Sequence, residues 1–370
     1  MDAFDPSTIA ARISEVRRLA ARAEVDAVVV THLPNIYFLT GFGGTAGALV
    51  IAPARCRLLV DSRYITAARA LVSGLPEDLL SVELIARSYD EAIVETLRQE
   101  GTARAGIEAA HLTVARFNAL AELGRQAVEL VPTQRIVERV RMVKDAVEIA
   151  IFREAAGRLS AVARRLGELA TAGRTEKEVA ALVEDAMRRA GFSRPAFDTI
   201  VASGPNSVLP HASPTDRVLQ AGDPTVLDFG GVYSGYCVDL TRTVQLGGIS
   251  GDMAPLFTAV AEAQKAAIEA IRPGVRPSAV DAAARKVLEG HGLGEAFGHG
   301  TGHGLGLEIH EDPRVGRFMA NLPDDPLEPG VVMTVEPGAY VPGLGGVRIE
   351  DDVLVTSDGC EVLTHVPTFL

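Results

Sequence analysis

The first third of the chain alternates helical and strand-like patterns. Apolar residues recur at helical spacing at residues 7–24, 64–72 and 90–100. Short apolar or β-branched runs predict strands at residues 25–31, 46–51, 57–60 and 128–131. Because helices and strands alternate along this part of the chain, the pattern predicts a small α/β domain over residues 1–132.

The rest of the chain, residues 133–370, is predicted to be a second domain. A charged helical pattern covers residues 137–169, and a capping box at Thr175–Glu178 predicts the start of a helix that ends near Gly191. Two more helices are expected at 253–271 and 278–290, among strands at 225–229, 236–244, 331–336 and 347–355. The fold class is therefore α/β, with an α+β second half.

Composition excludes several classes of function. The 370 residues are 47% hydrophobic and 23% charged, as in ordinary globular proteins. A net charge of −12 without a basic cluster argues against nucleic acid and anionic membranes as partners. Three widely spaced cysteines indicate no disulfide framework, and no apolar run is long enough to span a bilayer. The acidic start lacks a signal-peptide pattern, so we expect a cytoplasmic protein.

Two aspartates interrupt apolar strands. Asp228 lies within Val226–Phe229, and Asp239 lies within Tyr236–Thr241, with glycines between the two runs. If these runs form a hairpin, the carboxylates face each other across adjacent strands and require a cation to offset their repulsion. The alternative is a pair of strand-end aspartates that cap turns, and the two readings have equal weight from this segment alone.

A glycine-rich segment at residues 298–311 contains three histidines, His299, His303 and His310. Imidazole is a common ligand of transition metals, and glycine permits close approach of backbone to a site. A phosphate-binding loop does not fit because the segment contains no lysine. A zinc-binding helix does not fit because no His-Glu-x-x-His is present and the glycines would break a helix.

Two glutamates follow similar apolar runs. Glu336 ends the run 331–335, and Glu350 lies on a predicted strand with Arg348 and Asp352 on the same face. Either segment alone is better explained by a surface salt bridge than by a metal site. Together with the two aspartates and an imidazole, however, four carboxylates supply a charge of −4 that two divalent cations would neutralise.

These motifs resemble the pita-bread metallopeptidases, in the branch of the Xaa-Pro dipeptidases (prolidases) and Xaa-Pro aminopeptidases. The motifs follow one another through the second half of the chain at Pro210–Ala212, Leu227–Gly230, Val238–Thr243, His299–Glu311, Thr334–Gly338 and Val347–Asp351. The resemblance implies a creatinase-type N-terminal α/β domain followed by a pita-bread catalytic domain.

The resemblance also implies a ligand set for two divalent metal ions per chain: Asp228, Asp239, His303, Glu336 and Glu350. Asp228 would chelate one ion, and Asp239 and Glu350 would bridge both. His303 and Glu336 would complete the second ion. A bridging water or hydroxide would attack the peptide bond, with Glu336 as the group that accepts and passes on its proton.

Further roles follow from the same resemblance. His211 and His310 would contact the scissile carbonyl, and His299 would line the pocket for the residue after the cut. Arg348 would orient the carboxylate of Glu350. The expected activity is a metalloexopeptidase that cleaves short peptides before proline, with manganese expected ahead of cobalt or zinc, and a homodimer is expected. Dipeptidase and aminopeptidase activity both stay open.

Three alternatives have to be weighed against this reading. A metal-free pita-bread module that binds peptides or proteins usually loses several ligands, and all five are present here. A creatinase-like hydrolase uses histidine without metal and lacks the full carboxylate set. A methionine aminopeptidase has no need of the α/β domain that precedes the catalytic half.

Overall fold

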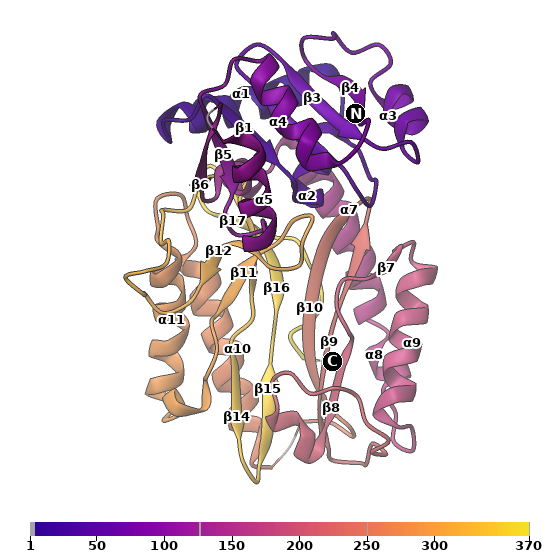
Figure 1. Cartoon of the computed structure of the whole chain (residues 1–370). Helices are drawn as coiled ribbons and strands as arrows, with labels where there is room; N and C mark the ends of the chain where they lie inside the picture. The colour runs from indigo at the N-terminus through magenta and orange to yellow at the C-terminus, as the bar shows by residue number, and fades with distance from the viewer. Residues whose placement is uncertain (1–3, 126, 250, 370) are drawn as a thin grey trace. The chain divides into compact units, whose positions relative to one another are not determined.

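The computed structural model describes residues 4–125, 127–249 and 251–369. The chain divides into two compact units, unit 1 (Met1–Arg141) and unit 2 (Met142–Leu370), which are coloured along the sequence in Figure 1. Position 132, where the sequence pattern ends the first domain, lies inside the last strand of unit 1. No helix in the described ranges has both the length and the apolar character that crossing a membrane requires.

Unit 1 is built on a mixed sheet with strand order β4-β3-β2-β1-β5-β6. The strands are β1 (Ala27–Val30), β2 (Ala48–Ile51), β3 (Cys56–Val60), β4 (Ser81–Leu84), β5 (Arg104–Glu108) and β6 (Glu129–Thr133). The helices are α1 (Pro6–Arg22), α2 (Leu33–Thr40), α3 (Ile65–Leu71), α4 (Tyr89–Gln99), α5 (Val114–Gly124) and α6 (Ile136–Met142). The helices and strands predicted in this part of the chain are therefore present.

Both faces of the unit 1 sheet are covered. Val29 packs in a core with Leu97 of α4 and Leu120 of α5, whereas the neighbouring Val28 and Val30 point to the opposite face and are also buried. Helix α1 contacts β1 and buries Ile9, Ile13 and Val16. This two-sided burial explains why the strands are almost continuously apolar.

Unit 2 contains the remaining elements. Its helices are α7 (Ala146–Ala163), α8 (Leu166–Leu169), α9 (Glu176–Arg189), α10 (Met253–Ala270) and α11 (Pro277–Gly290), with short 3-10 turns at Gly204–Val208 and Gly294–Ala296. Its strands are β7 (Arg194–Pro195), β8 (Ile200–Ser203), β9 (Pro224–Tyr233), β10 (Tyr236–Gln245), β11 (Gly302–Gly304), β12 (Glu311–Val315), β13 (Val332–Val335), β14 (Gly338–Val341), β15 (Gly345–Arg348), β16 (Asp351–Val355) and β17 (Cys360–Val362).

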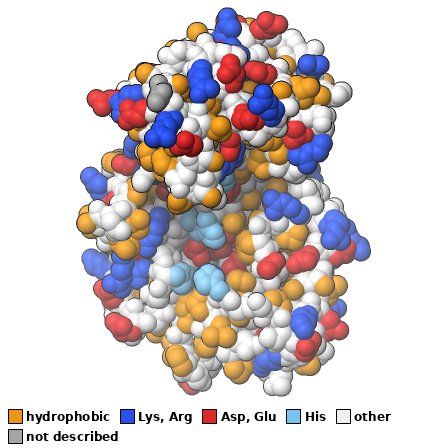
Figure 2. All heavy atoms as spheres, viewed as in Figure 1, with side chains coloured by type: hydrophobic (Ala, Val, Ile, Leu, Met, Phe, Trp, Pro, Cys, Tyr) orange, Lys and Arg blue, Asp and Glu red, His pale blue; other side chains and the backbone are white. Residues whose placement is uncertain are grey.

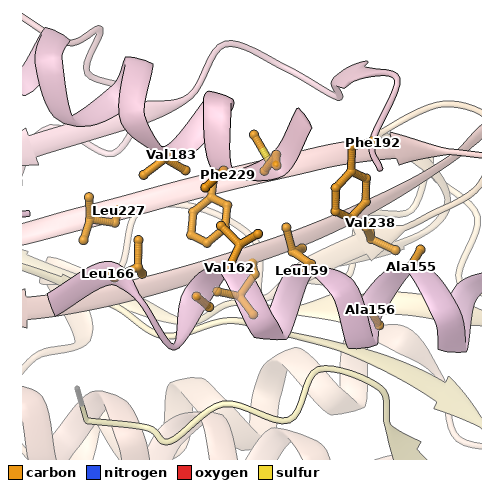
Figure 3. Packing of buried hydrophobic residues seen from close by; sticks show 14 of the residues in the cluster. Ala155, Ala156, Leu159, Val162, Leu166, Val183, Phe192, Leu227, Phe229 and Val238 are labelled. Carbon is orange, nitrogen blue, oxygen red and sulfur yellow. The ribbon is translucent and has the colours of Figure 1, made fainter. Parts of the chain in front are cut away.

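The strands of unit 2 lie between two groups of helices, with α8 and α9 on one side and α10 and α11 on the other (Figure 1). One path of strands runs β10-β9-β7 with β8 also paired to β9, and another runs β12-β11-β13-β16-β17. Figure 3 shows Leu159 and Val162 of α7 against Phe229 of β9 and Val238 of β10. This apolar layer fixes the outer face of the β9–β10 hairpin.

Two predicted elements are interrupted in the structure. The single helix expected over 137–169 is three helices, because Asp145 caps a new helix start with its side chain and forms a capping box with Glu148. The strand expected over 347–355 is also broken, since β15 ends at Arg348 and β16 begins at Asp351. Ile349 and Glu350 lie in the break.

Candidate metal centre

The hairpin of β9 and β10 carries the first two acidic residues. Its ladder pairs Asp239 with Gly230 and Asp228 with Thr241, so the two carboxylates are diagonal neighbours on one face, not direct partners. Only 9% of Asp228 and 5% of Asp239 is exposed. Two charged groups thus lie close together where water has little access.

The imidazole comes from β11, which pairs with β12 and β13. The Nδ1–H of His303 donates to the carbonyl of Gly304 at 3.0 Å, and the ring's Nε2 therefore keeps its lone pair. That nitrogen lies 3.5 Å from Oε1 of Glu336 and 3.9 Å from Oδ2 of Asp239. Burial lowers the pKa of His303, which favours the neutral ring that a metal binds.

Glu350 enters the cluster from the break between β15 and β16. The Thr241 hydroxyl donates to its Oε2 at 2.6 Å, and the other oxygen, Oε1, is buried without a hydrogen-bond partner. Asp239, His303 and Glu350 each offer an atom within 4.8 Å of the others, as expected of three ligands to one ion. Within the part of the chain that the structure describes, these three residues form a potential metal-binding group.

The electrostatics of the cluster favour bound cations. Burial, with the charges of Asp239 and Glu336, raises the pKa of Glu350 well above its usual range. Burial, with the charge of Asp228, does the same for Asp239, and burial raises the pKa of Glu336 to about 7. Divalent ions would offset this repulsion and give Oδ1 of Asp228, another buried oxygen without a hydrogen-bond partner, something to bind.

Arg348 contacts a different carboxylate from the one expected. Its Nη2 donates to Oδ2 of Asp228 at 2.5 Å, and its Nε donates to the Thr241 hydroxyl at 3.2 Å. It therefore reaches Glu350 only through Thr241. The break at Ile349–Glu350 also removes the regular alternation that would place Arg348 and Glu350 on one face of a single strand.

The other predicted histidines lie around the same cluster. The His310 ring is 4.4 Å from that of His303, edge to face, and the His310 side chain is exposed. His211, also exposed, lies near enough for its charge to lower the pKa of Glu336. Figure 2 shows histidine side chains gathered on one face of unit 2 with acidic side chains recessed between them.

His299 belongs to a hydrogen-bond chain. Its Nδ1–H donates to the Gly300 carbonyl at 2.8 Å, and its Nε2 lies 3.0 Å from the Tyr340 hydroxyl, which accepts from Nη1 of Arg348 at 2.7 Å. Burial, with the charge of Arg348, lowers the pKa of His299 to about 4, so the ring is neutral near pH 7. The hydroxyl of Tyr340 therefore donates to Nε2 of His299.

Three residues that contact the cluster were not anticipated. Thr241 holds Glu350, Tyr340 joins Arg348 to His299, and Asp352 accepts the backbone N–H of Asp239 at 3.1 Å. Asp352 is fully buried, and burial raises its pKa well above the usual range. The run of acids at 350–352 within an apolar stretch was a usable signal for Asp352, whereas nothing local distinguishes Thr241 or Tyr340.

Comparison with known proteins identifies relatives along nearly the whole chain. Residues 150–357 match the model of metallopeptidase family M24, and residues 12–143 match the creatinase/prolidase N-terminal domain. The uncharacterized peptidase YqhT of Bacillus subtilis is 36% identical over 96% of this chain and 98% of its own length.

Solved structures agree with these matches. A structure described as Xaa-Pro dipeptidase from Bacillus anthracis superposes with a TM-score of 0.92 at 36% identity, covering 98% of this chain and 100% of that one. The X-Pro aminopeptidase from Thermotoga maritima gives a TM-score of 0.84 at 33% identity, covering 96% and 99%. The two similar structures thus carry names of two different exopeptidase activities.

Proposed function

Because the chain belongs to metallopeptidase family M24 and has a creatinase/prolidase N-terminal domain, we propose that it is a dinuclear-metal exopeptidase acting before proline. The convergence of Asp239, His303 and Glu350 within 4.8 Å carries this proposal. Asp228 and Glu336 adjoin these three and complete a mixed oxygen and nitrogen donor set.

The five side chains would share two divalent ions. Asp228, Asp239, His303, Glu336 and Glu350 would hold these ions through their carboxylate oxygens and the imidazole nitrogen. Manganese is our proposed metal, ahead of cobalt or zinc. When bound, such ions lower the pKa of a water molecule and polarise the carbonyl of the peptide bond.

The chain's own groups then handle protons and charge. Glu336, a carboxylate within the ligand set, would accept a proton and return it to the leaving nitrogen. The exposed side chains of His211 and His310 are available to donate to a carbonyl oxygen that becomes negative. The buried Arg348 holds Asp228 in place through an ion pair.

Proline specificity rests on the named relatives. Proteins called Xaa-Pro dipeptidase and X-Pro aminopeptidase share this fold over nearly the full chain. A proline after the scissile bond leaves that bond without an N–H, so the pocket needs no acceptor at that place. The neutral His299 ring, held by Tyr340, is the proposed wall of the proline pocket.

The deciding experiment loads the purified protein with manganese and compares hydrolysis of Ala-Pro, Ala-Pro-Ala and Met-Ala. Cleavage of Ala-Pro alone establishes a dipeptidase, and cleavage of Ala-Pro-Ala establishes an aminopeptidase. Preference for Met-Ala would contradict proline specificity. If the purified protein binds no divalent ion and cleaves none of these three peptides, the proposal is wrong and a peptide-binding or protein-binding module is favoured instead.

We also propose a cytoplasmic location and a homodimer. All three cysteines are free thiols, and Cys56 and Cys237 are buried, which suits a reducing compartment. Light scattering of the purified protein tests the dimer. Fractionation of cells that express the protein tests the location.

A further inference from the structure

Arg242 of β10 is a buried arginine beside the proposed ligands, and the proposed chemistry does not use it. Only 1% of it is exposed. Its Nη1 donates to the carbonyls of Thr241, at 2.9 Å, and of Glu350. Its Nη2 donates to Oδ1 of Asp351 at 2.8 Å. Two of its five N–H groups therefore bind Glu350 and Asp351, and a third binds Thr241 of β10.

The other two N–H groups bind the C-terminal segment. The Nε–H donates to the carbonyl of Pro367 and the second Nη2–H to the carbonyl of Val366, both at 3.0 Å. The Thr364 hydroxyl donates to Asp351 at 2.7 Å and thereby joins the same network. Every N–H of the guanidinium has an acceptor, an arrangement that a lysine cannot reproduce.

Glu350 depends on these contacts because it lies outside the regular strands. Its backbone N–H donates to the carbonyl of Thr241 at 3.1 Å, and its own carbonyl accepts from Arg242. Its side chain accepts from Thr241. A buried carbonyl without a partner is costly, so loss of Arg242 would release the backbone of Glu350 from its present position.

We propose that Arg242 is a positioning residue for Glu350 and that the carbonyls of Val366 and Pro367 complete its support. The C-terminal segment is thus part of the metal centre although it supplies no ligand. This inference rests on the proposed role of Glu350 as a metal ligand. The alternative is that Arg242 stabilises the fold alone, without effect on metal affinity.

The test measures manganese binding by titration calorimetry on the folded, metal-free protein. Arg242→Lys keeps the charge beside Asp351 and is expected to weaken manganese binding by roughly 10–100-fold, as loss of other supporting contacts does. Excess manganese should restore kcat on Ala-Pro while KM stays unchanged. The control is Arg153→Lys, an exposed arginine paired with Glu361, which should bind manganese like the original protein.

A pair of truncations tests the C-terminal segment if Arg242→Lys fails to fold. A chain that ends after Thr368 keeps both backbone carbonyls, whereas one that ends after His365 loses them. His365 stays anchored in both chains, because its N–H donates to Ser160 at 2.9 Å and its carbonyl accepts from Arg164 at 2.6 Å. Only the shorter chain should bind manganese more weakly.

The outcomes separate the two proposals. If the unaltered protein binds manganese and the Arg242→Lys and short-chain variants bind it equally well, the positioning role is wrong and the metal centre stands. If these variants melt at lower temperature with unchanged manganese affinity, Arg242 is structural only. If the unaltered protein binds no manganese, both proposals fail.

Discussion

Three of the five proposed ligands are each held by a contact that leaves another atom available to a metal ion. Arg348 binds one oxygen of Asp228, Thr241 binds one oxygen of Glu350, and a carbonyl fixes the Nδ1–H of His303. The atoms left over are Oδ1 of Asp228, Oε1 of Glu350 and Nε2 of His303. Such preorganisation is what a ligand set needs to bind metal without first rearranging.

Removal of a bridging carboxylate is the most direct residue-scale test. We expect Glu350→Ala or Asp239→Ala to lower activity by more than about 100-fold and to abolish binding of a second ion. Loss of a ligand should reduce metal affinity more than loss of a residue that only supports a ligand. Metal content by mass spectrometry and kcat on Ala-Pro measure both effects. Glu361→Ala, at a half-buried acid on β17 that pairs with Arg153, is the control, and full turnover by either ligand variant would refute the assignment.

Tyr340 offers a finer test at the same scale. Tyr340→Phe keeps the buried ring but removes the hydroxyl between Arg348 and His299. We expect kcat/KM on Ala-Pro to fall by about 10-fold, because both partners lose a fixed orientation. The melting temperature should change little. Unchanged kcat/KM would show that this chain of hydrogen bonds has no part in the reaction.

At the scale of elements, glycine explains how β11 reaches the cluster. A Cβ on Gly302 would lie 2.1 Å from the backbone oxygen of Thr334, and one on Gly304 would lie 2.1 Å from that of Asp312. Neither oxygen can move without moving its strand. The glycines of this segment therefore allow β11 to fit closely between β12 and β13, which places His303 beside Glu336.

Gly302→Ala should therefore separate β11 from β13. We expect a loss of about 1–3 kcal/mol in the free energy of unfolding, the usual range for overpacking, together with a fall in activity. Denaturant unfolding and kcat on Ala-Pro measure the two effects.

Gly298→Ala is the matched control, because a Cβ there meets no atom within 4 Å. Equal stability and activity of the two alanine variants would contradict the explanation by close strand packing.

The sequence pattern predicts elements well where local signals decide them. Periodicity located α1, α10 and α11, and the capping box at Thr175 is present with both of its hydrogen bonds. No element was predicted for α2, whose buried residues include Asn35 and Thr40 beside apolar ones, so it lacks an amphipathic pattern. Nor was one predicted for β5, where Gly106 interrupts the strand pattern.

At the candidate site too, some features could be predicted from the sequence and others could not. The acids and histidines stand out by type and by their apolar surroundings, so they could be named from the sequence. Their partners could not, because the contacts of Arg348 with Asp228 and of Arg242 with the C-terminal segment join residues more than 100 positions apart. The break at Ile349–Glu350 likewise depends on contacts with β10 rather than on local residue preference.

At the scale of the whole molecule, unit 2 buries several acids that the folded chain must accommodate. Five of them lie at the candidate metal centre: Asp228, Asp239, Glu336, Glu350 and Asp352. The buried guanidinium of Arg348 forms an ion pair with one of these, Asp228. In metal-free protein this repulsion is relieved by protonation, and in metal-bound protein it would be relieved by the ions. The stability of the folded protein therefore depends on both pH and bound metal.

The sign of this linkage follows from the raised pKa values. Glu336 has a pKa of about 7 in the folded chain against an ordinary value of 4.5, so the folded state binds its proton more tightly. The stabilisation from this proton is complete below 4.5 and is lost as pH rises through about 7. We expect Glu336 to contribute a fall in the melting temperature of metal-free protein between about pH 5.5 and about pH 8, measured by calorimetry.

Manganese should oppose this fall. The ions compete with protons for Asp239, Glu336 and Glu350, whose pKa values are all raised, so metal binds more tightly as pH increases. The rise in melting temperature on adding manganese should therefore be larger at about pH 8 than at about pH 5.5. Glu336→Gln, which removes one titrating group, should flatten the metal-free pH dependence. An equal rise at both pH values would mean that the ions bind away from these carboxylates.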